Sequence, residues 1–149
     1  MNVRHTQVET ALGLLTLVAE DDRLVGLYFS GHWHLPKESS FGTRVDADVD
    51  EVFLRVKAEL DAYLAGERES FDVPLRTHGD EFSERVWAML EKIPYGTTTT
   101  YGSLAEQLGN RRLAQRVGQA VGWNPISIFI PCHRVVGADG SLTGYAGGL

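Results

Sequence analysis

The residue best suited to covalent chemistry is Cys132, the only cysteine of the chain. It lies between Pro131 and His133 in a segment, 124–136, that reads Asn-Pro-Ile-Ser-Ile-Phe-Ile-Pro-Cys-His-Arg-Val-Val. A thiol reacts as its thiolate, and we expect His133 and Arg134 to lower the pKa of Cys132 from about 8.5 toward neutrality. A lone cysteine forms no internal disulfide, so the sequence predicts either a nucleophile or an inert core thiol.

The histidine beside this cysteine is the first candidate for a base. Adjacent side chains in an extended segment point to opposite faces, so we expect His133 to act on the sulfur through a bridging water.

The other histidines give no metal site. The pair His32 and His34 supplies too few ligands for a closed metal site. We predict that these two, together with His5 and His78, face solvent.

Charge is distributed unevenly along the chain, whose net charge is -6. Residues 1–76 hold eight Lys and Arg against fourteen Asp and Glu, whereas residues 77–149 hold six of each. Beyond Gln107 the charged residues are Arg111, Arg112, Arg116 and Arg134 against Asp139. This local positive excess fits either a DNA-binding stripe or a solvated helix face, and charge alone leaves both open.

The first half of the chain is predicted to be an α/β unit without catalytic residues. Two strand-like runs, 14–19 and 24–29, flank Asp21-Asp22 and predict an antiparallel hairpin. A loop over 30–46 follows, and apolar residues from Val49 to Leu64 recur every three or four positions, as on one helix face closed by Gly66. We expect 70–75 to add a further strand.

The second half begins after a predicted junction at 76–79. Asp80 is placed to cap a helix with an apolar face that includes Trp87, and Ser103 to Glu106 fits a capping box at the start of another. After a turn at Gly109-Asn110, a further helix carries Leu113, Val117, Ala120 and Val121 inward and Arg112, Gln115, Arg116 and Gln119 outward. This pattern fits a helix-turn-helix or an ordinary helical hairpin; we favour DNA binding because the segment leads directly to Cys132.

The 124–136 string closely resembles the active-site signature of the O6-alkylguanine-DNA alkyltransferases, or methylated-DNA–protein-cysteine methyltransferases. Further matching motifs follow the same order: Ile-Pro-Tyr-Gly-Thr at 93–97, Thr-Tyr-Gly-Ser-Leu-Ala at 100–105 and Thr-Gly-Tyr-Ala-Gly-Gly at 143–148. The resemblance is strong over about 77–149. It implies a small ribonuclease-H-like domain over 1–76 and a helix-turn-helix, winged-helix-like catalytic domain over 77–149.

The resemblance implies irreversible, single-turnover transfer of an alkyl group from O6-alkylguanine, and from O4-alkylthymine, to Cys132 without a metal or other cofactor. The nucleotide must first be flipped out of the duplex. By the same resemblance, a water hands the thiol proton to His133, Tyr101 donates a hydrogen bond to guanine N3, and Asn124 braces the turn before the active segment. The expected partner is double-stranded DNA containing alkylated guanine, bound by a monomer, with cooperative binding left open.

The remaining site residues follow from the charge distribution and the helix pattern together with the resemblance. The DNA-binding set comprises Gln115, Arg116, Arg112, Arg111, Val121, Gly122 and Arg134. The substrate pocket comprises Ser127, Pro131, Val135, Tyr145, Ala146 and Gly147. Most relatives carry an arginine at position 115 for insertion into the duplex, whereas Arg116 here lies one residue, or about 100° of helix rotation, further on.

A second departure concerns the end of the sequence. Relatives continue into another helix, whose glutamate orients the histidine, and no residue here matches it. Either the sequence has been trimmed or His133 has another acceptor. If the glutamate is absent, we expect slower transfer and lower stability than in full-length relatives.

Two other functions compete with repair. An alkyltransferase-like protein binds the lesion without repairing it, although such proteins usually carry tryptophan in place of the cysteine. A cysteine hydrolase or redox sensor is a more distant alternative. With no apolar stretch near the roughly 20 residues that span a bilayer and no secretory signal, we expect a cytoplasmic protein.

Overall fold

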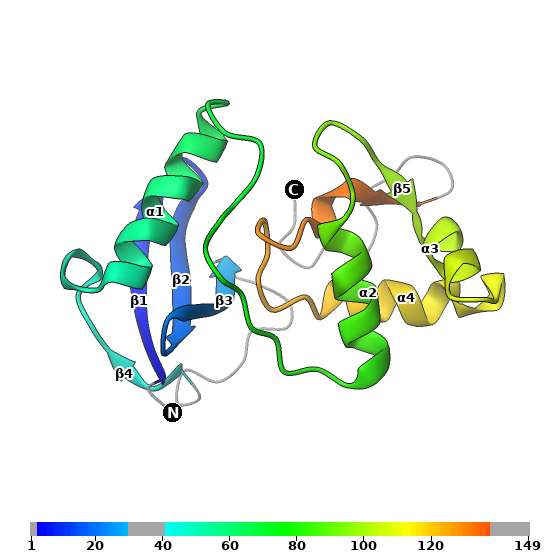
Figure 1. The fold of residues 1–149 in the computed structure, drawn as a ribbon, viewed down its shortest axis with the longest axis horizontal. Coiled ribbons are helices and arrows are strands. Elements are labelled where there is room, and N and C mark those ends of the chain that lie inside the picture. Colours follow the sequence, from blue (N-terminus) through cyan, green and yellow to red (C-terminus); the bar gives the residue numbers. More distant parts are fainter. Residues whose placement is uncertain (1–2, 30–40, 138–149) are drawn as a thin grey trace. The chain divides into compact units, whose positions relative to one another are not determined.

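The computed structural model describes residues 3–29 and 41–137, and the chain forms two compact units, 1–77 and 78–149 (Figure 1). The first unit combines a sheet with one long helix, and the second consists mainly of helices. The predicted fold class, a ribonuclease-like α/β piece followed by a helical DNA-binding piece, is confirmed. Among the described residues, no helix is both long and apolar enough to cross a bilayer.

The first unit is built on a sheet with strand order β3-β2-β1-β4. Strands β1 (Val3–Thr10), β2 (Gly13–Glu20) and β3 (Arg23–Phe29) are antiparallel neighbours, so the predicted hairpin over 14–29 is confirmed. Strand β4 (Thr43–Arg44) pairs in parallel with β1. It falls inside the segment that we predicted to be a loop, of which 30–40 lie outside the described residues.

One face of this sheet is covered by α1 (Glu51–Leu64), which follows the short turn η2 (Ala47–Val49). Asp50 caps α1 by accepting the backbone N–H groups of Val52 and Phe53, and it also pairs with Arg4 of β1. Phe53, Val56 and Leu60 are fully buried. The predicted helix is therefore confirmed, but its first apolar residue was assigned wrongly: Val49 precedes the helix and is 80% exposed.

The segment 70–75 does not form the strand that we predicted. Only Leu75 forms a bridge to the sheet, opposite Leu24 of β3. The Leu24 N–H donates to the Pro74 carbonyl at 2.9 Å, and the Arg76 N–H donates to the Leu24 carbonyl at 3.0 Å. Pro74 has no N–H with which to continue the ladder, which explains why the pairing stops at a single bridge.

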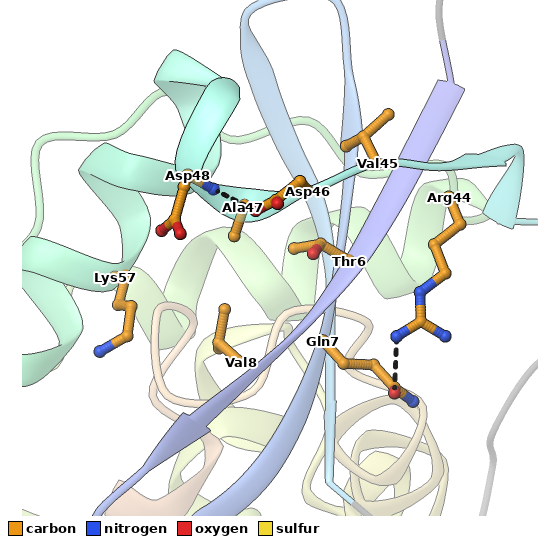
Figure 2. Close-up of a pocket in the computed structure, with 9 residues that line it drawn as sticks. All are labelled: Thr6, Gln7, Val8, Arg44, Val45, Asp46, Ala47, Asp48 and Lys57. Carbon is orange, nitrogen blue, oxygen red and sulfur yellow. Dashed lines mark hydrogen bonds between the residues drawn. The ribbon is translucent and has the colours of Figure 1, made fainter.

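An open groove of about 560 Å³ borders β1 beyond its short pairing with β4 (Figure 2). Its charged groups are Arg44, Lys57, Asp46 and Asp48; Arg44 donates to the Gln7 side chain at 3.4 Å, and Asp46 accepts the Asp48 N–H at 2.9 Å.

On strand β1, His5 is 5% exposed and lies 5.7 Å from the Phe41 ring. Our prediction that His5 faces solvent is therefore wrong; His32 and His34 lie outside the described residues.

The second unit begins with α2 (Glu81–Glu91), capped by Asp80, which accepts the Ser83 N–H at 2.8 Å as predicted. Strand β5 (Thr99–Thr100), α3 (Tyr101–Gln107), the turn η3 (Arg111–Leu113) and α4 (Ala114–Gly122) follow. The chain then reaches the turn η4 (Cys132–Arg134) and β6 (Val135–Val136). Both α2 and α3 pack on α4.

Two details of this helical unit bear on the predictions. Trp87 is a core residue, as expected: it is 6% exposed and its indole N–H donates to the Ala120 carbonyl at 2.8 Å. The predicted capping box at Ser103 is wrong. Thr100 caps α3 by accepting the Ser103 N–H at 3.0 Å, so the helix begins at Tyr101.

Candidate active site around Cys132

Cys132 lies in a tight turn in the interior of the second unit. Its side chain is 3% exposed. Pro131 adopts φ -79° and ψ 68°, and the Cys132 N–H donates to the Ile130 carbonyl at 2.8 Å, which together define an inverse γ-turn. Cys132 and His133 then belong to η4 rather than to an extended segment. The expectation that their side chains point to opposite faces of a strand is therefore wrong.

Asn124 connects the end of α4 to this turn. Its side-chain amide donates to the Ile130 carbonyl at 2.7 Å, and its side-chain oxygen accepts the Ile126 N–H at 3.0 Å. The same side chain hydrogen-bonds to Cys132. Asn124 is only 3% exposed, so each of these bonds is made away from bulk water. The bracing role that we predicted for Asn124 is supported by these contacts.

The segment between Asn124 and Cys132 folds back on itself. The Phe129 N–H donates to the Ser127 carbonyl and the Ile130 N–H to the Ile126 carbonyl, both at 2.9 Å. Ile128, at the tip, has φ 74°, a left-handed conformation that a β-branched residue rarely adopts. Backbone outliers of this kind persist where the surrounding contacts over-determine them, and they cluster at functional sites.

Burial changes the expected acidity of the thiol. Desolvation raises the pKa of Cys132 to about 11, although hydrogen bonds from Asn124 and from the backbone N–H groups of Cys132 and His133 act in the opposite direction. The predicted net shift toward neutrality is therefore wrong, although the backbone N–H of His133 acts in the predicted direction. In this conformation the thiol is protonated at neutral pH, and its ionisation needs a base.

His133 is suited to be that base. It is half-buried, and its pKa is lowered first by desolvation and then by the positive charge of Arg134. A lowered pKa keeps the imidazole neutral near pH 7, so that it can accept a proton. Arg134 itself donates to the Ile93 carbonyl at 2.6 Å and lies 5.6 Å from the centre of the Tyr95 ring, contacts that hold it within the unit.

Tyr101 is brought to the same site by the pairing of β5 with β6. Thr99 is opposite Val135 and Thr100 is opposite Val136, so the start of α3 lies beside the chain that leaves η4. The pKa of Tyr101 is raised by desolvation and, to a smaller degree, by its proximity to Cys132. The phenol therefore remains protonated and able to donate a hydrogen bond.

The predicted pocket residues are only partly described. Ser127, Pro131 and Val135 are buried beside the turn, at 1% exposure for Ser127 and Val135. Tyr145, Ala146 and Gly147 lie outside the described residues. Within the described ranges, no group of three His, Cys, Asp or Glu residues could hold a metal ion.

The predicted DNA-binding residues separate into exposed and buried members. Gln115, Arg116, Arg111 and Arg112 are exposed, but Arg116 stacks on Phe82 at 4.0 Å and Arg111 pairs with Glu106 at 2.7 Å. Val121 is 1% exposed and Gly122 is also buried, so the prediction that these two contact DNA is not compatible with their places in this structure. Both belong to the helix face that packs inward.

One exposed residue on this helix was missed by the sequence analysis. Trp123, at the C-terminal cap of α4, is 57% exposed. Its spacing of four residues from Gln119, and of eight from Gln115, places it on the same outward face and could have identified it.

Residues 3–77 match the family model described as the ribonuclease-like domain of 6-O-methylguanine DNA methyltransferase, and residues 81–149 match the model of its DNA-binding domain. A methylated-DNA–protein-cysteine methyltransferase of Mycolicibacterium paratuberculosis is 42% identical over 147 residues, which cover 99% of this chain and 86% of that protein. A constitutive one of Bacillus subtilis is 40% identical, covering 96% of this chain and 86% of its own length.

Solved structures show the same similarity. The crystal structure of Mycobacterium tuberculosis O6-methylguanine methyltransferase matches with a TM-score of 0.85 and 40% identity, covering 99% of this chain and 86% of that chain. The structure of Mycobacterium tuberculosis OGT in complex with DNA matches with a TM-score of 0.86 and 38% identity, covering 97% of this chain and 85% of that one.

Proposed function

The chain belongs to the 6-O-methylguanine DNA methyltransferase family, and we propose that Cys132 is the residue that accepts the alkyl group in its reaction. The protein is a methylated-DNA–protein-cysteine methyltransferase that acts on DNA by direct reversal of damage. Cys132 is the only cysteine in the chain, so no other thiol can take this role. Because a thioether is not readily cleaved, each molecule reacts once.

The observation that carries this proposal is the set of hydrogen bonds that holds Cys132 in its turn. Asn124 and the Cys132 N–H both donate to the Ile130 carbonyl, at 2.7 and 2.8 Å, and Asn124 also contacts the sulfur. A reacting atom that is fixed in this way loses less entropy when substrate arrives than a thiol on a mobile loop.

The transfer forms a sulfur–carbon bond and breaks the bond between that carbon and guanine O6. With a pKa of about 11, only about one Cys132 in ten thousand is ionised at pH 7. We therefore assign His133, neutral at this pH, the role of accepting the thiol proton, through a water molecule where the two groups are not in direct contact. The electron pair of the broken bond moves onto the purine, and Tyr101 stabilises that charge by donating a hydrogen bond.

Recognition of the lesion needs a side chain to support the flipped nucleotide. Gln115 is exposed on the outward face of α4, whereas Arg116 is engaged with Phe82 at 4.0 Å. This contrast favours Gln115 over Arg116 for insertion into the duplex. We further propose that O4-alkylthymine is also a substrate, that the protein binds DNA as a monomer, and that it works in the cytoplasm, where a free thiol stays reduced.

Intact-mass measurement tests the proposal directly. The protein is incubated with a duplex that contains O6-methylguanine, and peptide mapping locates any added methyl group. We expect one methyl per chain, on Cys132, and none in Cys132→Ser. Binding of the lesion without a gain in mass would instead support the lesion-binding alternative, and a methyl group on another residue would refute the role of Cys132.

A further inference from the structure

The exposed indole of Trp123 is not used by the chemistry described above. It is 57% exposed, whereas Trp87 in the same unit is 6% exposed. The backbone N–H of Trp123 donates to the Gln119 carbonyl at 3.0 Å, which continues the hydrogen-bonding pattern of α4 through this residue. The helix therefore holds the backbone of Trp123, and the exposed part of its large apolar ring lies at the C-terminal end of α4.

Trp123 also extends the outward face of α4. Gln115, Gln119 and Trp123 follow one another at intervals of four residues, and all three are exposed, so they form a stripe along successive helix turns. The next residue, Asn124, turns inward and braces Cys132. The chain continues from α4 (Figure 1) into the segment that carries η4, so the active-site turn follows this helix in the sequence.

We propose that Trp123 is a further DNA-binding residue, packing its indole ring against the sugar and base edge of a nucleotide beside the lesion. This inference rests on the proposed function, because it takes the outward face of α4 as the DNA-binding surface. Amide side chains precede Trp123 on the stripe and Arg112 is exposed at its other end, a composition suited to nucleic acid. An aromatic ring beside such groups supplies apolar contact that phosphate-binding residues cannot supply.

The position of Trp123 along the helix separates its contact from that of Gln115. Eight residues separate it from Gln115, a distance of about 12 Å along a helix axis. This separation exceeds the rise of about 3.4 Å between base pairs, so Trp123 and Gln115 meet different nucleotides. Trp123 therefore contributes to holding the duplex beside the extruded base, and it does not fill the gap that this base leaves.

The contact that we infer has a distinctive energetic signature. Stacking of a single-stranded base on an aromatic ring is sequence-tolerant and contributes about 1–3 kcal/mol. For a contact with the sugar and base edge we expect the lower part of this range, a loss of about tenfold in affinity. No phosphate is neutralised, so the slope of log Kd against log salt concentration should not change. Arg112→Ala, which removes a cation from the same surface, should instead reduce that slope by about one.

The experiment measures Kd for a duplex containing O6-methylguanine over a range of salt concentrations, with the full chain in the Cys132→Ser background so that no transfer occurs. We expect Trp123→Ala to bind about tenfold more weakly at every salt concentration, with the parental slope, and Trp123→Phe to recover most of the affinity. Leu54→Ala is the matched control, because Leu54 is 47% exposed on α1 of the other unit. It should bind as the parent does.

Fluorescence gives a second readout that a purely structural role would not produce. Addition of DNA should shift the indole emission of the parent to shorter wavelength, and this shift should be absent in Trp123→Phe. Parental affinity in Trp123→Ala, or a change in its salt slope, would overturn the inference. So would an altered self-association of Trp123→Ala with unchanged DNA affinity, which would assign the ring to a contact between two copies.

Failure of this inference is distinguishable from failure of the proposed function. If protein with Cys132 intact gains one methyl group but Trp123→Ala keeps parental affinity, only the role of Trp123 is wrong. If that protein gains no methyl group while Trp123→Ala loses affinity, the DNA contact stands and the repair reaction does not.

Discussion

Replacement of Asn124 by alanine is the sharpest test of how the active-site turn is held. The substitution leaves the buried Ile126 N–H without its acceptor, and it removes one of the two donors to the Ile130 carbonyl. A buried donor left unsatisfied costs about 1–3 kcal/mol, and loss of a hydrogen bond from a carbonyl that keeps its other donor costs about 1 kcal/mol. We therefore expect Asn124→Ala to destabilise the protein by about 2–4 kcal/mol.

The same substitution should slow the chemistry. The Asn124 side chain lowers the pKa of Cys132, so its removal raises that pKa further above about 11 and makes the thiolate scarcer. A hydrogen bond to a charged group contributes about 1.5–3 kcal/mol, which corresponds to a transfer rate about 10- to 100-fold lower at neutral pH. The rate is measured by intact mass under single-turnover conditions, with DNA in excess.

Urea unfolding followed by circular dichroism gives the stability difference, and Asn110→Ala provides the control. Asn110 caps η3 by accepting the Arg112 N–H at 2.9 Å, but it is exposed, so its loss should cost no more than about 1 kcal/mol. If Asn124→Ala unfolded at the same urea concentration as Asn110→Ala and transferred methyl at the parental rate, our account of the turn would be refuted.

Three further predictions concern stability. A β-carbon at Gly79 would lie 2.5 Å from the Trp87 ring, so Gly79→Ala should destabilise the second unit by about 1–3 kcal/mol in urea unfolding; equal stability would contradict the packing described. Glu59 is 7% exposed and accepts two backbone N–H groups, at 2.8 and 3.3 Å, so Glu59→Ala should cost about 2–4 kcal/mol, measured in the same way. The pKa of Cys132 is near 9 in the unfolded chain and about 11 in the folded protein. As the pH rises from 9 to 11, the unfolded chain therefore loses this proton first, and the stability that the buried thiol contributes below pH 9 is lost. Cys132→Ser should therefore lose less stability than the parent between pH 9 and 11, and identical losses would show that another group is responsible.

Local patterns in the sequence predicted most of the helices. Apolar spacing identified α1, α2 and α4, and Asp80 was recognised as a cap because a carboxylate before an apolar run satisfies free backbone amides. The start of α3 was misplaced, since Thr100 and Ser103 are both good capping residues. What selects Thr100 is the pairing of β5 with β6, a contact with residue 136 that no local pattern contains.

The site around Cys132 was likewise predicted only in part from the sequence. The sequence identifies the nucleophile and its neighbours, but it does not reveal burial, and burial determines the direction of the pKa shift of this thiol. Likewise, Arg116 and Arg134 resemble free cations in the sequence. In the folded unit they meet Phe82 and the Ile93 carbonyl, respectively, partners that are 34 and 41 positions away in the chain.

The Ile130 carbonyl accepts hydrogen bonds from residues on both sides of the segment 125–131, and this closes the segment into a ring. The Cys132 bond spans only residues 130–132, whereas the Asn124 bond spans the whole segment, so insertion or deletion of a single residue between Pro125 and Ile130 should move the Ile130 carbonyl away from the Asn124 amide. Side chains within the segment can be exchanged during protein engineering more readily than its number of residues. Libraries that aim to widen the range of accepted lesions should therefore vary residue type at constant length.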